Sequence, residues 1–135
     1  MGAISKVLRS VEGGGLLFRC PGCNEGHMIR HGEGPGPRWT WNGNAEKPTF
    51  TPSVLVWWEE PANIGDVQAL RRDIEAARAR KEAGATGDEA KIPQVSKRCH
   101  SFVTDGRIQF LSDCTHEMAG QTVDLPPVEH RTIEA

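Results

Sequence analysis

Residues 98–116 constrain the fold of this chain more than any other stretch. Two runs of β-prone residues flank Asp105 and Gly106, a dipeptide that accepts the positive φ angles of a tight hairpin turn. A two-residue loop fixes the register of the strands that it joins, so that Ser101 faces Phe110. The stretch therefore predicts an antiparallel hairpin that closes at Asp105 and Gly106.

This predicted hairpin separates two sets of reactive side chains, because neighbouring residues of a strand point to opposite faces. The register places Cys99 opposite Ser112, with Cys114 one step beyond on the same face. His100 and Asp113 share the other face. We therefore expect two thiols on one side of the hairpin and a His–Asp pair on the other.

Length and charge narrow the class of protein. The 135 residues are enough for one domain with a single core. A formal net charge of −2 disfavours a general nucleic-acid binder. No apolar run approaches the roughly 18 residues of a membrane span, and no apolar signal core follows the N-terminus. We expect a cytoplasmic protein with no membrane segment.

Four cysteines in a cytoplasmic chain are more typical of metal ligands than of disulfides. Cys20 and Cys23 are separated by Pro21 and Gly22, so both thiolates can bind one ion from one tight turn. Two alternatives are buried reduced thiols that pack as small apolar residues, and a redox-active dithiol. The sequence predicts a structural Zn²⁺ ion held by Cys20, Cys23, Cys99 and Cys114, with His100 or His116 as a substitute for one cysteine.

The remaining residues predict short strands and one helix. The run 54–58 is continuously apolar, so we expect a strand at the centre of the sheet. Composition changes at Glu59, and residues 59–96 are typical of an insertion that holds a helix over 66–83 and a flexible linker. The predicted fold of residues 1–135 is a single, mainly β domain of small α+β type. In it, two zinc-clamped hairpins, one over 98–116 and one with Cys20 and Cys23 at its tip, lie in a small antiparallel sheet that carries one helical insertion.

A catalytic arrangement is the second hypothesis. His100 with Asp113 beside it has the pattern of a general base and the group that orients it. Ser53, at the entry to the 54–58 strand, is the best-placed nucleophile. If zinc kept an open coordination position, His100, His116 and Glu117 would instead serve water activation. The alternative is a purely structural role, in which the histidine is held by hydrogen bonds and the serine only forms a turn.

Tryptophan is unusually frequent, with four residues in a chain that has no tyrosine. Packing in and around the core is one interpretation. The other is an exposed aromatic face that binds a protein partner. The helix over 66–83 carries a narrow apolar stripe and offers a second surface for such a partner. The tryptophans are Trp39, Trp41, Trp57 and Trp58.

Several motifs together resemble a known family. They are Cys20-Pro21-Gly22-Cys23, Trp39-Thr40-Trp41-Asn42-Gly43, Lys47-Pro48-Thr49-Phe50-Thr51-Pro52-Ser53, Cys99-His100-Ser101-Phe102 and Asp113-Cys114-Thr115-His116. The combination is similar to a small phage and prophage domain family of unknown function, whose members are often mislabelled as ammonia monooxygenase. That label implies a copper enzyme of the membrane, which this sequence does not resemble.

A divergent branch of that family resembles proteins encoded beside bacterial ubiquitin-like conjugation enzymes, for which a peptidase role has been suggested. The branch shares the cysteine pair, a Pro-Thr-x-x-Pro-Ser segment and a histidine-containing strand before a glycine turn. Ser53 and His100 are among the shared positions, so the resemblance implies a hydrolytic role for them. The matching positions are Cys20, Cys23, Pro48, Thr49, Pro52, Ser53 and His100.

The sequence therefore predicts a small zinc-binding accessory protein of phage type in the cytoplasm of a bacterial host, with a structural zinc ion. The first alternative is a peptidase-like hydrolase that acts on ubiquitin-like conjugates through Ser53 and His100, with Asp113 as the orienting group. The second alternative is a non-catalytic module that binds a protein through the tryptophan face or the helix.

Overall fold

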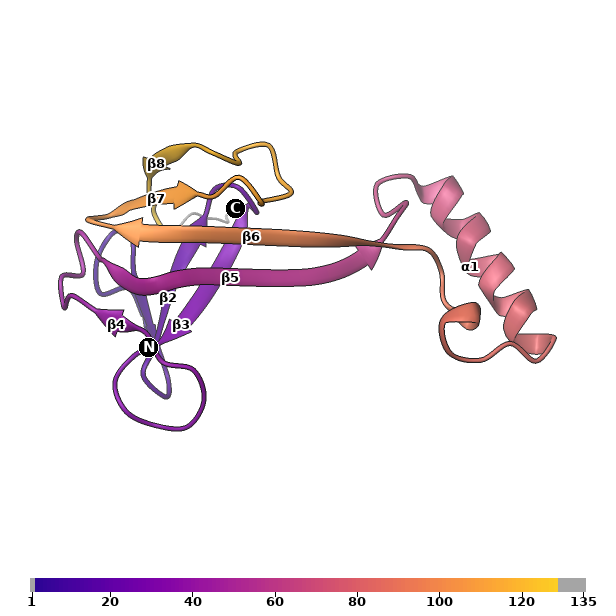
Figure 1. The fold of residues 1–135 in the computed structure, drawn as a ribbon, viewed down its shortest axis with the longest axis horizontal. Coiled ribbons are helices and arrows are strands. Elements are labelled where there is room, and N and C mark those ends of the chain that lie inside the picture. The colour runs from indigo at the N-terminus through magenta and orange to yellow at the C-terminus, as the bar shows by residue number, and fades with distance from the viewer. Residues whose placement is uncertain (1, 129–135) are drawn as a thin grey trace. The chain divides into compact units, whose positions relative to one another are not determined.

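A computed structural model describes residues 2–128, and these residues divide into two compact units. The first unit holds the chain up to Val56 and the chain from Arg98 onward. The second unit is the intervening segment Trp57–Lys97, within which the predicted insertion 59–96 falls. The two long strands β5 (Phe50–Pro61) and β6 (Gln94–Thr104) each contribute to both units (Figure 1).

The first unit contains two antiparallel sheets. The smaller sheet has the order β1-β2-β3, and the larger sheet has the order β4-β5-β6-β7-β8. The mainly β fold with one α-helix is thus confirmed, although the strands form two sheets and not one. The remaining strands are β1 (Arg9–Val11), β2 (Gly15–Cys20), β3 (Glu25–Arg30), β4 (Thr40–Trp41), β7 (Arg107–Phe110) and β8 (Thr122–Asp124).

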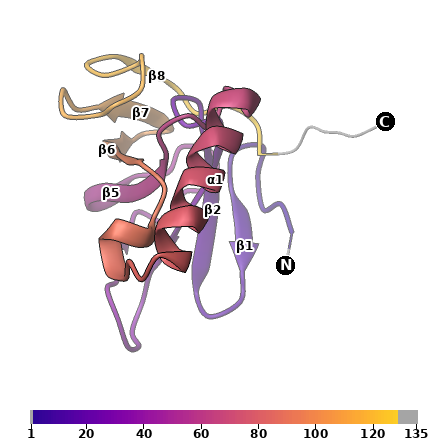
Figure 2. The same cartoon turned by 90° about the vertical axis from the view of Figure 1, so that its right-hand side faces the viewer.

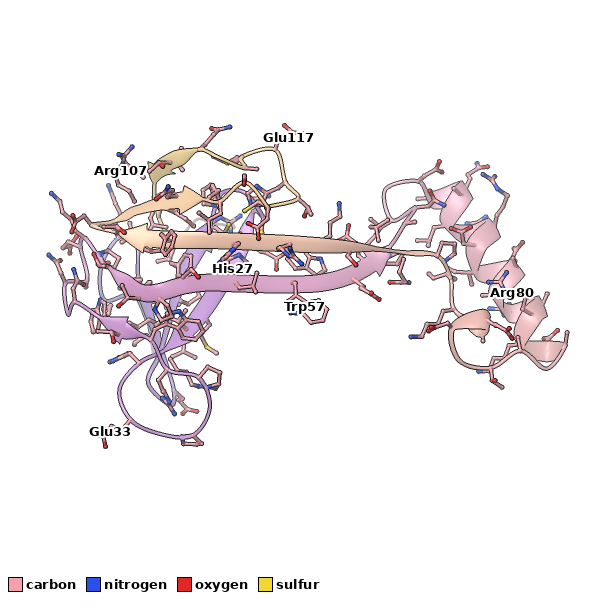
Figure 3. The ribbon with its side chains drawn as sticks, in the orientation of Figure 1. His27, Glu33, Trp57, Arg80, Arg107 and Glu117 are labelled. Carbon is pink, nitrogen blue, oxygen red and sulfur yellow. The ribbon has the colours of Figure 1, made fainter. Side chains whose placement is uncertain are left out.

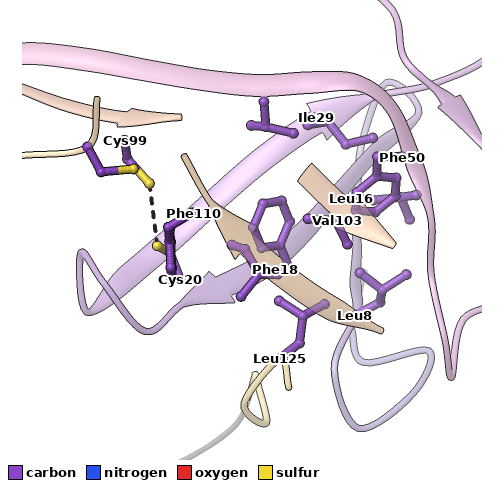
Figure 4. Packing of buried hydrophobic residues seen from close by; sticks show 13 residues of the cluster. Leu8, Leu16, Phe18, Cys20, Ile29, Phe50, Cys99, Val103, Phe110 and Leu125 are labelled. Atoms are coloured by element: carbon purple, nitrogen blue, oxygen red, sulfur yellow. Dashed lines mark hydrogen bonds between the residues drawn. The ribbon is translucent and has the colours of Figure 1, made fainter. Parts of the chain in front are cut away.

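The core of the first unit forms where side chains of the two sheets meet (Figure 4). Phe18 of β2 is fully buried, and its ring centroid lies 5.8 Å from that of Phe50 on β5. Strands β2, β5, β6 and β7 contribute residues of one face only, as the two-residue period of a strand requires. The buried apolar set is Leu8, Leu16, Phe18, Cys20, Ile29, Phe50, Val54, Cys99, Val103, Ile108, Phe110, Cys114 and Leu125.

The hairpin of β6 and β7 has the predicted register, with Ser101 opposite Phe110 and a turn at Asp105 and Gly106. Both turn residues have positive φ, 51° and 79°. The expected pairing of Cys99 with Ser112 is wrong, because β7 ends at Phe110 and the chain then turns. The Cys114 N–H donates to the Leu111 carbonyl at 3.2 Å, which closes this turn.

Strand β5 lies between β4 and β6 in the larger sheet, as expected for a central strand. Its apolar residues are nevertheless not all buried, because only one face of the strand meets the core. Val54 is buried, whereas Leu55 is half exposed. Ser53 and Leu55 share the outward face of β5. This strand therefore holds a half-buried serine on its outward face.

The second unit contains helix α1 (Val67–Glu82), close to the predicted 66–83, and the short 3₁₀-helix Gly87–Ala90 (Figure 2). Asp66 caps the start of α1, because its side chain accepts a hydrogen bond from the Ala69 N–H at 3.0 Å. Arg80 donates to the Glu89 and Lys91 carbonyls at 2.8 and 2.9 Å (Figure 3). These bonds give the predicted flexible linker a defined path.

Within residues 2–128, the structure has no helix with the length and apolar character that a membrane crossing requires. The cytoplasmic location stays a prediction, and so does the single domain over residues 1–135, whose ends lie outside the described residues.

The core analysis predicts the effect of Phe18→Ala. Removing a fully buried aromatic ring should lower the free energy of unfolding by about 3–5 kcal/mol. Urea denaturation followed by circular dichroism measures the change. Phe102→Ala on the exposed face is the matched control, and it should cost less than about 1 kcal/mol. Equal losses for the two variants would contradict the assignment of the core.

Candidate functional site

Ser53, His100 and Asp113 form a continuous hydrogen-bonded chain at the outer face of the larger sheet. The Ser53 Oγ lies 2.9 Å from His100 Nε2, and His100 Nδ1 lies 3.1 Å from an oxygen of Asp113. Serine, histidine and carboxylate groups in this order have the geometry of a nucleophile, its general base and the group that orients the base.

The carboxylate of Asp113 determines which of the two His100 nitrogens carries the ring proton. An ionised carboxylate can only accept, so Asp113 favours a proton on His100 Nδ1. The lone pair of Nε2 then faces the Ser53 hydroxyl. Arg98 lies 3.7 Å from the same Asp113 oxygen, and the Asp113 side chain is 41 % exposed. The carboxylate thus keeps partial access to solvent while it contacts two cationic or ionisable groups.

The backbone of the serine and that of the histidine are each held by a second side chain. The indole N–H of Trp39 donates to the Ser53 carbonyl at 3.1 Å. The His100 N–H donates to the Cys114 sulfur, and the Cys114 thiol donates to the His100 carbonyl, both at 3.2 Å. Trp39 was expected to pack or to bind a partner, and the sequence held no signal for its contact with Ser53.

A second cluster of side chains lies on the buried face of β6, the strand that carries His100. Ligand atoms of Cys20, Cys23, Cys99 and His116 all lie within 4.8 Å of one another. All four cysteines of the chain are free thiols. Three sulfurs and one imidazole are a ligand set that is typical of structural zinc sites. The described residues thus contain a group that could hold a metal ion.

The spacing of the sulfurs fits a tetrahedral ion. Zinc–sulfur bonds of about 2.3 Å place two sulfurs of a tetrahedron about 3.8 Å apart. The Cys20 and Cys99 sulfurs lie 3.7 Å apart (Figure 4). The Cys23 N–H also donates to the Cys20 sulfur at 3.4 Å, a contact that stabilises a thiolate in a tight turn.

The close thiols hold their protons unequally. A hydrogen bond from the Cys99 thiol, helped by His27 and the Cys23 N–H, outweighs burial and lowers the pKa of Cys20 to about 4. Burial and the charge of Cys20 raise the pKa of Cys23 to about 12. The hydrogen bond to Cys20, followed by burial, raises the pKa of Cys99. A bound cation would displace the protons of Cys23 and Cys99.

His116 fits the same group through its ring position. Its Nε2 is buried and has no hydrogen-bond partner among residues 2–128. The ring packs edge-on against Phe110 at 4.6 Å and lies directly over Gly22, where any Cβ atom would overlap it. The Met118 N–H donates to His116 Nδ1 at 3.2 Å, which leaves the ring proton on Nε2. Binding an ion through Nε2 would move that proton to Nδ1, and the hydrogen bond from Met118 would then break.

Cys114, one of the four predicted ligands, lies outside this group. The turn after β7 directs its sulfur to the backbone of His100 instead. His116, which the sequence offered as a substitute, occupies the fourth position. His100, the other substitute, contacts Ser53 and Asp113. Glu117 is exposed and is not part of the group.

The fold and this geometry define a small β protein that combines a Ser–His–Asp chain with a Cys/His group. Residues 3–111 match the model of a family described as bacterial ubiquitination-like system serine protease (BubE). The chain belongs to this family. The predicted link to peptidases associated with ubiquitin-like systems is thus confirmed. Comparisons with curated proteins and with solved structures yield no significant match.

The site predicts that Gly22→Ala weakens metal binding, because the added methyl group must displace the His116 ring. We expect the zinc affinity, measured by competition with a chromophoric chelator, to fall by roughly 10–100-fold, the scale of a lost ligand orientation. Gly65→Ala is the matched control, since nothing lies within 4 Å of the added atom. An unchanged affinity for Gly22→Ala would show that His116 is not a ligand.

Proposed function

We propose that this protein is a serine peptidase whose nucleophile, general base and orienting group are Ser53, His100 and Asp113. The observation that carries the proposal is the unbroken chain of two hydrogen bonds, of 2.9 and 3.1 Å, through these three side chains. The family's description as a serine protease supports the same class of reaction.

The proposed reaction follows from the positions of the protons. His100 Nε2 takes the hydroxyl proton as Ser53 Oγ attacks a substrate carbonyl carbon, and Asp113 stabilises the resulting imidazolium. His100 then gives that proton to the leaving amine, and an acyl ester of Ser53 remains. A water molecule, activated by His100, hydrolyses the ester and restores the serine.

The substrate that we propose is a peptide or isopeptide bond to a ubiquitin-like protein. This finer statement is supported by the family's association with a bacterial ubiquitination-like system and by the sequence resemblance described above. The site lies on the outer face of a sheet, with Asp113 exposed. An open site of this kind suits a bond that is carried on a folded protein.

We also propose that the Cys20, Cys23, Cys99 and His116 group binds a structural zinc ion. Four protein ligands fill a tetrahedral shell and leave no position for a reacting water molecule. The zinc would hold β2, β6 and the loop after β7 together, and it would take no part in bond cleavage. A phage-type accessory role and a non-catalytic interaction module stay predictions from the sequence.

The proposed function predicts the behaviour of Ser53→Ala. A fluorophosphonate probe, which reacts with activated serines, should label the native protein, and Ser53→Ala should abolish the labelling. Peptide hydrolysis should fall by at least about 10³-fold, because nothing else can replace the nucleophile. Ser96→Ala, at an exposed serine, is the matched control. Equal labelling of all three proteins would exclude Ser53 as the nucleophile.

Trp39→Phe tests whether the indole positions Ser53. The change removes one hydrogen bond of about 1 kcal/mol, so we expect kcat to fall about fivefold with an unchanged KM. Trp41→Phe is the matched control, because the Trp41 indole N–H has no partner among the described residues. If both variants lose the same activity, the effect is one of packing and not of position.

A further inference from the structure

A shallow depression of about 260 Å³ lies in the first unit, on strands β6, β7 and β8. Its floor is a row of side chains from three paired strands, since Phe102 faces Gln109 and Gln109 faces Thr122. Thr104, Asp105 and Arg107 line the rest of it. None of these six side chains takes part in the proposed bond cleavage.

The depression begins close to the proposed catalytic serine and histidine. Phe102 lies two residues beyond His100 on β6, so both side chains point to the outer face. Two residues of strand span about 6.7 Å. An extended peptide covers the same distance in two residues. A side chain in the depression would therefore belong to a residue within about two positions of the cleaved bond.

The charges of the depression favour a cationic side chain. The cation of the depression, Arg107, has a carboxylate partner beside it, because its Nε lies 3.2 Å from an oxygen of the exposed Asp124. The Asp105 carboxylate is exposed and forms no ion pair with any residue of 2–128. The turn holds Asp105 at one edge, and its backbone N–H is bonded to the Thr49 hydroxyl at 2.9 Å. One unpaired negative charge thus remains.

Phe102 supplies a complementary apolar surface. Its side chain is 39 % exposed on an otherwise polar row. The methylene stem of arginine or lysine packs on such a ring, while the charged end extends past it to a carboxylate. A neutral aliphatic side chain could cover the ring but would leave Asp105 unpaired. The depression therefore matches a long basic side chain better than an apolar one.

We propose that this depression is a specificity subsite that binds an arginine or lysine side chain of the peptide substrate, within two residues of the cleaved bond. Phe102 contacts the stem of that side chain, and Asp105 pairs with its charge. The inference rests on the proposed peptidase function, because it uses Ser53 and His100 to define where the bond lies.

The first test is the cleavage preference of the whole protein. Peptides made by cutting a bacterial proteome after acidic residues keep their arginines and lysines internally. Cleavages that Ser53→Ala abolishes are identified by mass spectrometry. We expect a basic residue to be enriched at one fixed position within two residues of the cleaved bond. A cleavage profile with no basic preference would overturn the subsite.

The second test assigns that preference to Asp105. Asp105→Asn removes the charge and keeps the turn, because asparagine also accepts a φ of 51°. We expect the basic enrichment to fall by roughly threefold, the scale of an exposed charge pair. Asp88→Asn, in the second unit, is the matched charge control and should change nothing. A preference that persists in Asp105→Asn would contradict the assignment.

A binding measurement separates the subsite from the proposed function. If no cleavage depends on Ser53, the peptidase proposal has failed, and the depression is then judged on binding alone. The probes are N-acetyl-arginine amide and its neutral norleucine analogue, added to ¹⁵N-labelled Ser53→Ala. Amide shifts at Phe102, Thr104 and Asp105 with the arginine probe alone, reduced by Asp105→Asn, would support the subsite. No shift at tens of millimolar would overturn it.

Discussion

The contact between the Cys20 and Cys99 sulfurs is the interaction on which the rest of the site depends. Cys20 ends a strand of the smaller sheet, and Cys99 lies on β6 of the larger sheet, so the 3.7 Å contact joins the two sheets. Both side chains are buried. A buried thiolate without a countercharge is costly, and a cation bound by all four ligands would remove that cost. The same cluster fixes the loop that carries Asp113 and His116.

The side chains of β6 alternate between the two faces of the sheet, so the same strand carries a buried ligand and a surface histidine. Cys99 points into the core and His100, the next residue, points to the outer face. Asp113 and Cys114 repeat the arrangement in the loop after β7, where Cys114 is buried and Asp113 is exposed. His100 and Asp113 are thus each the sequence neighbour of a buried cysteine. A rigid buried group behind a functional one is what holds a reactive geometry in place.

Local patterns predicted the parts of the site that local rules determine. The Asp105-Gly106 turn fixed the register of β6 and β7. The expected proximity of His100 and Asp113 is found, but the loop after β7 brings it about and the strand register does not. Local rules could not predict that His116 takes the place of Cys114 among the four possible metal ligands. That outcome depends on where β7 ends, and tertiary packing sets the ends of strands. The division into two sheets escaped prediction for the same reason. The contact of Trp39 with Ser53 joins the residue before β4 to β5, which no periodicity reveals.

The second unit is inserted in the sequence between Val56 and Arg98. Trp57–Lys97 is a compact body of its own. Within it, the Ala62 N–H donates to the Pro93 carbonyl at 2.8 Å, which joins the residue after β5 to the residue before β6. No residue of the Ser–His–Asp chain or of the Cys/His group belongs to it. The residues between β5 and β6, 62–93, can therefore change in number without adding or removing a side chain of either group. A longer, shorter or different 62–93 segment would give the protein another recognition surface while the residues of both groups stay the same.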